Sequence, residues 1–338
     1  MSTLAFEPWP TCSISTLFWK TLASKKLNEF QKGRIDLPIK SFYAQNSSKK
    51  AQLFFSTESF ESKVISVAEM GSNFKELQGI LVLCDTIEEF KGLDRAAEAS
   101  KIAERNLNVE ELNDIYHFVI FAFADVKKFK FYHQIAYPVK MFISEQISWT
   151  NVEESVNVDE NTLDMTQAYN VDLERKTITL WDSSVVKNVP GWILRSILVT
   201  LSQKFPGESF TVTSLRLNDS SSRFTVKLPE NNSLSGITGW EISPSDPSKV
   251  APVRVTDISA LIDPIQLAKQ AGELNLKLMK WRLVPDLNLD VISRTSCLLV
   301  GSGTLGCNIL RVLLVRFGIY KTFLKLLLFR VGDLEGSV

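Results

Sequence analysis

Histidine and cysteine are scarce in this sequence of 338 residues, which contains only two and four of them. The residues are Cys12, Cys84, Cys297 and Cys307, with His117 and His133. No two cysteines form a C-x-x-C pair, and neither histidine has a companion at ligand spacing. These counts argue against a disulfide framework and against a zinc site. We therefore predict no metal ligands and assign these six residues structural roles.

An excess of charge of one sign is also missing, because 38 Lys and Arg residues balance 38 Asp and Glu residues. General binding to nucleic acids or membrane surfaces needs a basic excess, so we expect neither. The most apolar stretch, residues 309–329, is interrupted by basic side chains, which argues against a membrane span. The first residues lack the basic start and apolar core of a signal peptide. The cytosol is therefore the default compartment.

Packing material is plentiful, with 45% hydrophobic residues that include 21 Phe and 7 Trp. The length indicates two or three domains, and no internal repeat or low-complexity tract is visible. We predict an α+β front domain with a first lobe over 1–150 and a second lobe over 151–285. Residues 286–338 form the third segment.

The patterns of the front domain predict individual elements. Helices are expected over 16–30, 87–104, 110–123 and 191–204, and strands over 53–55, 79–84, 129–138, 177–180, 210–217 and 223–228. In the first helix, Leu17, Phe18, Leu22 and Leu27 are placed near one face. Polar composition indicates a connector over 151–170 and loops over 229–252. A long helix over 257–283 is expected to contain Pro264 at a first-turn position.

A glycine-rich turn near the end of the sequence is the most specific motif. Residues 296–300 form an apolar strand pattern, Gly301, Gly303 and Gly306 follow in G-x-G-x-x-G spacing, and a helical pattern covers 307–317. Strand, glycine turn and helix in this order favour nucleotide binding. Gly301 permits the tight turn, Gly303 lets the backbone approach a phosphate, and Gly306 lets helix and strand pack. The N–H groups at the helix start favour an anion.

The second half of a dinucleotide site is less clear. An acidic residue that holds the ribose is expected about 20 residues after the turn. The next strand candidate, residues 323–329, contains no acid, and Asp333 comes late. Two other interpretations stay open: a plain tight turn between strand and helix, and an NAD-dependent oxidoreductase. The missing acid speaks against the oxidoreductase.

Residues 274–290 (LNLKLMKWRLVPDLNLD) carry a more specific signal. Together with the glycine turn up to Arg311, they resemble the join between the two domains of the autophagy-related ubiquitin-like modifier-activating enzymes. This is the homodimeric, non-canonical E1-like family. Further similar segments lie at 25–30, 123–137, 191–198 and 263–278. The resemblance covers about residues 6–318.

The resemblance implies a fold and a function. The front domain of the family recruits E2-like conjugating enzymes, and a Rossmann-like (ThiF/MoeB-type) rear domain binds ATP and adenylates the C-terminal glycine of a ubiquitin-like modifier. A cysteine then takes the modifier as a thioester, since a thiolate attacks the activated acyl group readily. The resemblance also implies a protein of the cytoplasm and the preautophagosomal structure, linked to autophagy and protein transport.

Only some family residues transfer to this sequence. Gly301, Gly303, Thr304 and Gly306 match the phosphate cradle of the ATP site, whereas Leu326 stands where the family has its ribose-binding aspartate. From residue 323 onward the sequence does not resemble the family. The catalytic cysteine, the zinc cysteines and the modifier-binding tail are expected beyond position 338. We therefore expect 286–338 to be a truncated, poorly packed start of the adenylation domain, with doubtful ATP binding.

A second match lies at the other end, where Phe6-Glu7-Pro8 stands in place of a Phe-Ala-Pro motif of the family, with Glu7 as the departure. The motif is either a hydrophobic anchor or part of the recruitment of a conjugating enzyme. Whether this chain is itself an enzyme stays open, and no catalytic residue is assigned. The leading hypothesis is the activating enzyme in shortened form. The alternative is a non-catalytic module that binds conjugating enzymes and is monomeric, unlike the family homodimer.

Overall fold

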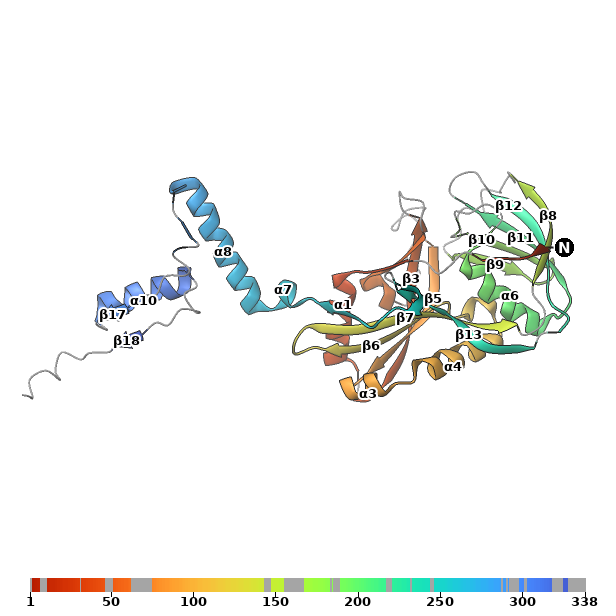
Figure 1. The fold of residues 1–338 in the computed structure, drawn as a ribbon, viewed down its shortest axis with the longest axis horizontal. Coiled ribbons are helices and arrows are strands. Elements are labelled where there is room, and N and C mark those ends of the chain that lie inside the picture. The colour runs from red at the N-terminus through yellow and green to blue at the C-terminus, as the bar shows by residue number, and fades with distance from the viewer. Residues whose placement is uncertain are drawn as a thin grey trace, which may run out of the picture. The chain divides into compact units, whose positions relative to one another are not determined.

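The computed structural model divides the chain into two compact units, Met1–Thr256 and Asp257–Val338, which are described separately (Figure 1). The described residues are 2–6, 11–30, 32–45, 51–61, 75–142, 147–154, 167–182, 184, 189–216, 221–231, 233–243, 246–286, 288–289, 291, 298–300, 303–317 and 325–327.

The first unit is built on two sheets. The order of the eight-stranded sheet is β13 (Leu234–Trp240), β7 (Lys130–Phe142), β6 (Val119–Asp125), β5 (Lys75–Cys84), β3 (Ile35–Gln45), β4 (Ala51–Phe55) and β2 (Thr11–Ile14), with β16 (Arg254–Asp257) also on β7. The order of the six-stranded sheet is β1 (Ser2–Thr3), β8 (Ser148–Glu154), β12 (Ser222–Lys227), β11 (Ser209–Leu215), β10 (Thr177–Trp181) and β9 (Tyr169–Asp172). The predicted mixture of helices and strands is thus confirmed.

The two sheets repeat one topology. In the first, β3 and β5 are antiparallel, a helical crossover leads to the parallel strand β6, and β7 follows antiparallel. In the second, β9 and β10, then β11 and β12, have the same order and the same directions. Parallel neighbours need such a crossover, usually a helix. The crossover helices are α3 (Ile87–Gly92) with α4 (Arg95–Leu107) in the first and α6 (Trp192–Lys204) in the second. A ββαββ repeat therefore exists without a repeat in the sequence.

The crossover helices also join the two sheets. Helix α4 packs on β7 and β13 and against α6, and α6 also packs on β7. Another helix, α1 (Thr16–Asn28), is capped by Ser15, whose side chain accepts a hydrogen bond from the Phe18 N–H. The large aromatic rings Trp19, Phe121 and Trp192 are almost fully buried between these elements. Their burial supplies a large share of the hydrophobic stabilisation.

The second unit contains α7 (Ser259–Ile262), α8 (Pro264–Leu283), β17 (Leu298–Val300), α10 (Thr304–Phe317) and β18 (Lys325–Leu327). The long helix is confirmed, with Pro264 at its first position, where a missing N–H breaks no helical hydrogen bond. Several of its apolar side chains are exposed, and Trp281 is 78% exposed.

Residues 110–123 were predicted to be a helix, and this is wrong. They contain a single 3-10 turn, Leu112–Asp114, followed by the start of β6. Val119, Ile120 and Phe121 are all fully buried, with β5 on one side of the strand and β7 on the other. A strand covered on both faces is apolar on both faces and loses the alternation that identifies an exposed strand.

Residues 229–252 were predicted to be loops, but they contain β13 and a small hairpin of β14 (Ile242–Ser243) with β15 (Asp246–Val250). Gly236 and Gly239 both have positive φ values, and the register of β13 on β7 shifts beside them. A Cβ on Gly239 would overlap the Tyr137 carbonyl. Glycines that signal a loop in the sequence here permit β-bulges in a strand.

Smaller corrections concern element ends and faces. The helix predicted over 87–104 is two helices, because Asp94 caps a new one by accepting from the Ala97 N–H. The connector predicted over 151–170 holds the end of β8 and the start of β9, and 155–166 lie outside the described residues. In α1, Leu17 and Leu27 are exposed, since 100° per residue turns them away from the buried Phe18 and Leu22. Within the described residues, no helix is long and apolar enough to cross a membrane.

Candidate functional site

The N-terminal segment is fixed along the edge of the six-stranded sheet. Strand β1 pairs antiparallel with β8, with Ser2 opposite Trp149. The pairing continues one residue further, where the Leu4 N–H donates to the Ile147 carbonyl at 2.9 Å. Backbone hydrogen bonds thus determine where the following side chains point. They direct Leu4 and Phe6 into one pocket.

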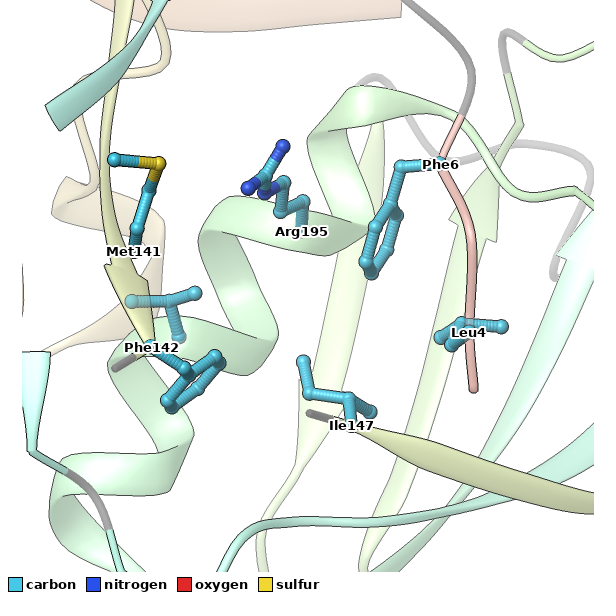
Figure 2. A pocket seen from close by; sticks show the side chains of 7 residues that line it. Leu4, Phe6, Met141, Phe142, Ile147 and Arg195 are labelled. Atoms are coloured by element: carbon cyan, nitrogen blue, oxygen red, sulfur yellow. The ribbon is translucent and has the colours of Figure 1, made fainter. Parts of the chain in front are cut away.

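This pocket, which we call the Arg195 pocket, has a cavity volume of about 320 Å³. It is lined by Leu4, Phe6, Met141, Phe142, Ile147, Arg195 and Val199. Figure 2 shows side chains from the N-terminal segment, the end of β7, the start of β8 and helix α6 turned toward one another. Phe6 is half-buried, and the Arg195 guanidinium lies 5.8 Å from its ring centroid. Distant parts of the sequence meet here, so spacing alone could not reveal the site.

The structure therefore places one residue of the Phe6-Glu7-Pro8 motif. Phe6 packs in the Arg195 pocket, whereas Glu7 and Pro8 lie outside the described residues. The role of the motif in recruitment stays a prediction.

The glycine turn lies in the second unit, between β17 and α10. Thr304 begins α10, and the Cys307 N–H donates to the Gly303 carbonyl at 2.9 Å. No atom lies within 4 Å of where a Cβ on Gly303 would stand, so the backbone is open on that side. Gly301 lies outside the described residues, and Gly306 is partly buried in the first turn of α10. The order of strand, turn and helix is as the sequence indicated.

The strand beside this turn has no acid. Strand β18 pairs parallel with β17, and Leu326 lies opposite Leu299. The sequence of β18 is Lys-Leu-Leu, so a carboxylate for a ribose hydroxyl is missing from this strand. Open N–H groups at the start of a helix fit a phosphate, but β18 does not fit a ribose. Cys307 is exposed in α10 and is not packed in a core.

A buried polar chain in the first unit has the residue types of a catalytic site. His117 Nδ1 lies 2.8 Å from Ser196 Oγ, and His117 Nε2 lies 3.0 Å from Tyr169 Oη. Each hydroxyl oxygen also lies within hydrogen-bond distance of a backbone carbonyl, Ser196 Oγ at 2.9 Å from that of Ile193 and Tyr169 Oη at 2.7 Å from that of Leu112. Burial lowers the pKa of His117 to about 3, so the ring is neutral near pH 7. Only one ring nitrogen then carries a proton, so the ring donates a hydrogen bond to one hydroxyl and accepts a hydrogen bond from the other.

These three side chains are at most 5% exposed, so no substrate reaches the serine. These hydrogen-bonded side chains connect the loop before β6, helix α6 and β9, and their role is to join the two sheets. His133 is also buried, and its ring lies 4.8 Å from that of Trp19. The structural roles predicted for both histidines are confirmed by their burial. Sequence reasoning missed their partners, because Tyr169 and Ser196 are remote in sequence.

Asp182 organises a second buried polar cluster at the start of α6. Its carboxylate accepts from the N–H groups of Ser184 and Gly191 and from the Ser214 hydroxyl. The Arg216 guanidinium pairs with it at 3.0 Å. Gly191 is the residue that precedes α6, so this carboxylate lies near the positive end of the helix dipole. Among the residues that the structure describes, no group of three His, Cys, Asp or Glu could hold a metal ion.

The comparisons with known proteins agree with one another. The family model "Ubiquitin-like modifier-activating enzyme ATG7 N-terminus" matches residues 4–170 and 151–262. The ATG7 of Kluyveromyces marxianus is 30% identical over an alignment of 344 positions that covers 93% of this chain and 54% of that protein. The ATG7 of Saccharomyces cerevisiae (strain YJM789) is 30% identical over an alignment of 356 positions, which covers 94% of this chain and 55% of that protein. The chain thus spans about half the length of these curated relatives.

Solved structures show the same fold. The crystal structure of Kluyveromyces marxianus Atg7NTD superposes with a TM-score of 0.61 at 22% identity, over 76% of this chain and all of that one. A chain of the Kluyveromyces marxianus Atg7NTD–Atg10 complex gives a TM-score of 0.60 at 22% identity, over 77% and 99%. Taken with the family model, which covers most of the sequence, these matches show that the chain belongs to the ATG7 N-terminus family of ubiquitin-like modifier-activating enzymes.

Proposed function

We propose that this chain serves autophagy as the part of an E1-like activating enzyme that binds E2-like conjugating enzymes. The match of the family model across residues 4–262 carries the proposal, because this range includes both sheets of the first unit. The fold supports it, since a chain of the same fold has been crystallised with Atg10. No catalytic group is needed for this role, and the buried His117 chain fits it as a structural feature of a binding domain.

Titration calorimetry of the 338-residue chain with an Atg10-type conjugating enzyme tests the proposal. We expect a one-to-one complex with a Kd of about 10 μM or tighter. A matched control is Trp281→Ala in the second unit, where the side chain is exposed and no described contact would be lost. Unchanged binding by this variant would assign the contact to the first unit. Absence of heat with an Atg10-type enzyme would contradict the proposal.

A nucleotide is the second ligand to consider. The family's ATP would place its phosphates at Gly303, Thr304 and Gly306, where the open turn meets the first N–H groups of α10. When bound, ATP supplies the activation of the modifier's C-terminal carboxylate, and the residues of the turn would hold and orient its phosphates. Strand β18 offers no acid for the ribose, so we expect phosphate contacts without ribose discrimination.

This part of the proposal has its own test. In spectra of the ¹⁵N-labelled chain, ATP and inorganic triphosphate should both shift the Gly303 and Gly306 amides, at similar concentrations. A Gly303→Val variant should lose the shifts, because its side chain would fill the open side of the turn. ATP-dependent thioester formation with a modifier protein then separates the two hypotheses, the activating enzyme and the binding module alone.

A further inference from the structure

Helix α6 is buried on nearly every side, and Arg195 is the exception. Of residues 192–202, every one except Arg195 is buried. The helix therefore meets solvent along this part of its length only where Arg195 faces the Arg195 pocket. A long cationic side chain is an unusual choice for the one open position in an otherwise buried stretch of helix. Its contacts decide whether it serves the fold or a ligand.

Arg195 lacks a carboxylate partner among the described residues. Its ring contact with Phe6 is its one described interaction, and burial lowers the pKa of its guanidinium. An arginine in a protein stays protonated even so. The charge is therefore partly removed from water, and no described residue supplies an opposite charge to offset the cost in free energy. By contrast, Arg216, the residue that follows β11, is paired with Asp182.

The other six lining side chains are all apolar: Leu4, Phe6, Met141, Phe142, Ile147 and Val199. A single cation in an apolar cavity does not fit a polyphosphate or an anionic membrane, which attract clusters of basic groups. It fits a carboxylate, which can accept two parallel hydrogen bonds from a guanidinium. The volume of about 320 Å³ leaves room for a neighbouring apolar side chain.

We propose that the Arg195 pocket binds a segment of a partner protein in which an Asp or Glu stands beside a large apolar side chain. The carboxylate pairs with Arg195, and the apolar side chain packs on Phe6 and Met141. In Figure 2 the guanidinium extends on the side of the pocket between Met141 and Phe6. Met141 is 38% exposed there, and a methionine adapts well to different apolar side chains. The inference does not depend on which partner the proposed function names.

Methyl groups in the pocket report binding directly. The chain is labelled at Met, Leu, Ile and Val methyls and titrated with the blocked peptide acetyl-Ala-Leu-Glu-Leu-Ala-amide. We expect shifts at Met141, Leu4, Ile147 and Val199 and none at the buried Ile178 of β10. The same peptide with Gln in place of Glu should bind at least about tenfold more weakly, since it lacks the charge. Equal shifts with both peptides, or none with either, would overturn the proposal.

Two variants locate the carboxylate. Arg195→Gln should lower the affinity for the Glu-containing peptide at least about tenfold and leave the affinity for the Gln-containing peptide unchanged. Met141→Glu leaves Arg195 in place and adds a carboxylate at the rim, so it should also weaken the Glu peptide. Because Met141 is partly exposed, this variant can fold even where a change on α6 cannot. If Met141→Glu leaves binding unchanged, the peptide binds elsewhere and the proposal fails.

The chain's own carboxylates are the competing occupants. Glu7 and Glu145 stand close in sequence to Phe6 and Phe142, but both lie outside the described residues. If Glu7→Gln or Glu145→Gln raises the affinity for the Glu-containing peptide about tenfold or more, the chain's own carboxylate occupies the pocket and the proposal is wrong. Unchanged affinity in both variants leaves the pocket for a partner.

Discussion

The two crossover helices of the first unit occupy equivalent places in the ββαββ repeat, yet their sequences differ. Helix α4 buries Ala99, Ile102, Ala103 and Asn106 and exposes the charged residues Lys101, Glu104 and Arg105. Helix α6 is buried almost all round. The difference follows from what lies outside each helix: α6 packs against α4 and the neighbouring β7, whereas the outer face of α4 meets water. Equal topology therefore does not impose an equal hydrophobic pattern.

The polar side chains of α6 show how a fully buried helix tolerates hydroxyls. Ser196, Thr200 and Ser202 donate to the carbonyls of Ile193, Ser196 and Val199 on their own helix. Each hydroxyl thus has a partner in its own backbone, so none is left unsatisfied by burial. Arg195 has no such solution, which is why its position matters.

The largest loss of stability is expected at the first residue of α6. Trp192 is 1% exposed, and its ring lies 5.0 Å from Tyr137 of β7 and 5.9 Å from His117. Trp192→Ala should lower the free energy of unfolding by about 3–5 kcal/mol, because it removes apolar burial and leaves a cavity. Urea unfolding followed by circular dichroism measures it. A loss under about 1 kcal/mol would show that α6 is not the central helix described above.

The next effect concerns the residues before α6. Asp182→Ala removes the carboxylate that pairs with the Arg216 guanidinium and accepts from the N–H groups of Ser184 and Gly191. We expect a loss of about 3 kcal/mol, since breaking a buried ion pair from one side uncovers a charge. Asp182→Asn keeps an acceptor and should lose less. Equal losses in the two variants would mean that the hydrogen bonds contribute nothing.

A smaller, pH-dependent effect is expected at the junction of the sheets. The pKa of His117 is lowered to about 3 in the folded chain by burial, against about 6.5 when unfolded. As the pH falls below 6.5, the unfolded state binds a proton that the folded state does not. The contribution of His117 to stability is therefore complete above pH 6.5. Between pH 6.5 and about pH 3, this contribution should fall by about 1.4 kcal/mol per pH unit.

His117→Gln is the matched variant, because it keeps hydrogen-bonding groups and removes the titration. Between pH 6.5 and pH 5, the free energy of unfolding of this variant should fall less steeply than that of the unchanged chain. The reason is that its unfolded state lacks the proton that His117 takes up. His133, whose pKa burial lowers to about 4, still contributes in both proteins. Parallel slopes for the two proteins would contradict the assignment.

The smallest effect is expected on the outer face of α4. The Lys101 side chain is 71% exposed, and it pairs with Glu98 at 2.8 Å. Lys101→Ala should change the free energy of unfolding by no more than about 0.5 kcal/mol, because Lys101 is exposed and the less exposed Glu98 keeps its ion pair with Arg34. The same urea titration measures it. A loss near that of Trp192→Ala would remove the contrast between the two helices.

Much of the fold and part of the site could be predicted from residues close in sequence. The helices at 16–28, 192–204 and 264–283, several strands including β5, β7, β10, β11 and β12, and the strand–turn–helix order around Gly303 follow from local patterns. The family resemblance rested on contiguous segments as well, and the comparisons confirm it. These features depend on periodicity, capping and turn chemistry, which act over a few residues.

Only the tertiary structure decided the rest. Whether 119–125 forms a strand depended on the neighbours β5 and β7, and the glycines of β13 could be placed only against Tyr137. The Arg195 pocket brings together side chains remote in sequence, those of Leu4 and Phe6, of Met141, Phe142 and Ile147, and of Arg195 and Val199. The partners of His117 lie 52 and 79 positions away. Burial and charge pairing are properties of segments brought together by folding, so no local pattern specifies them.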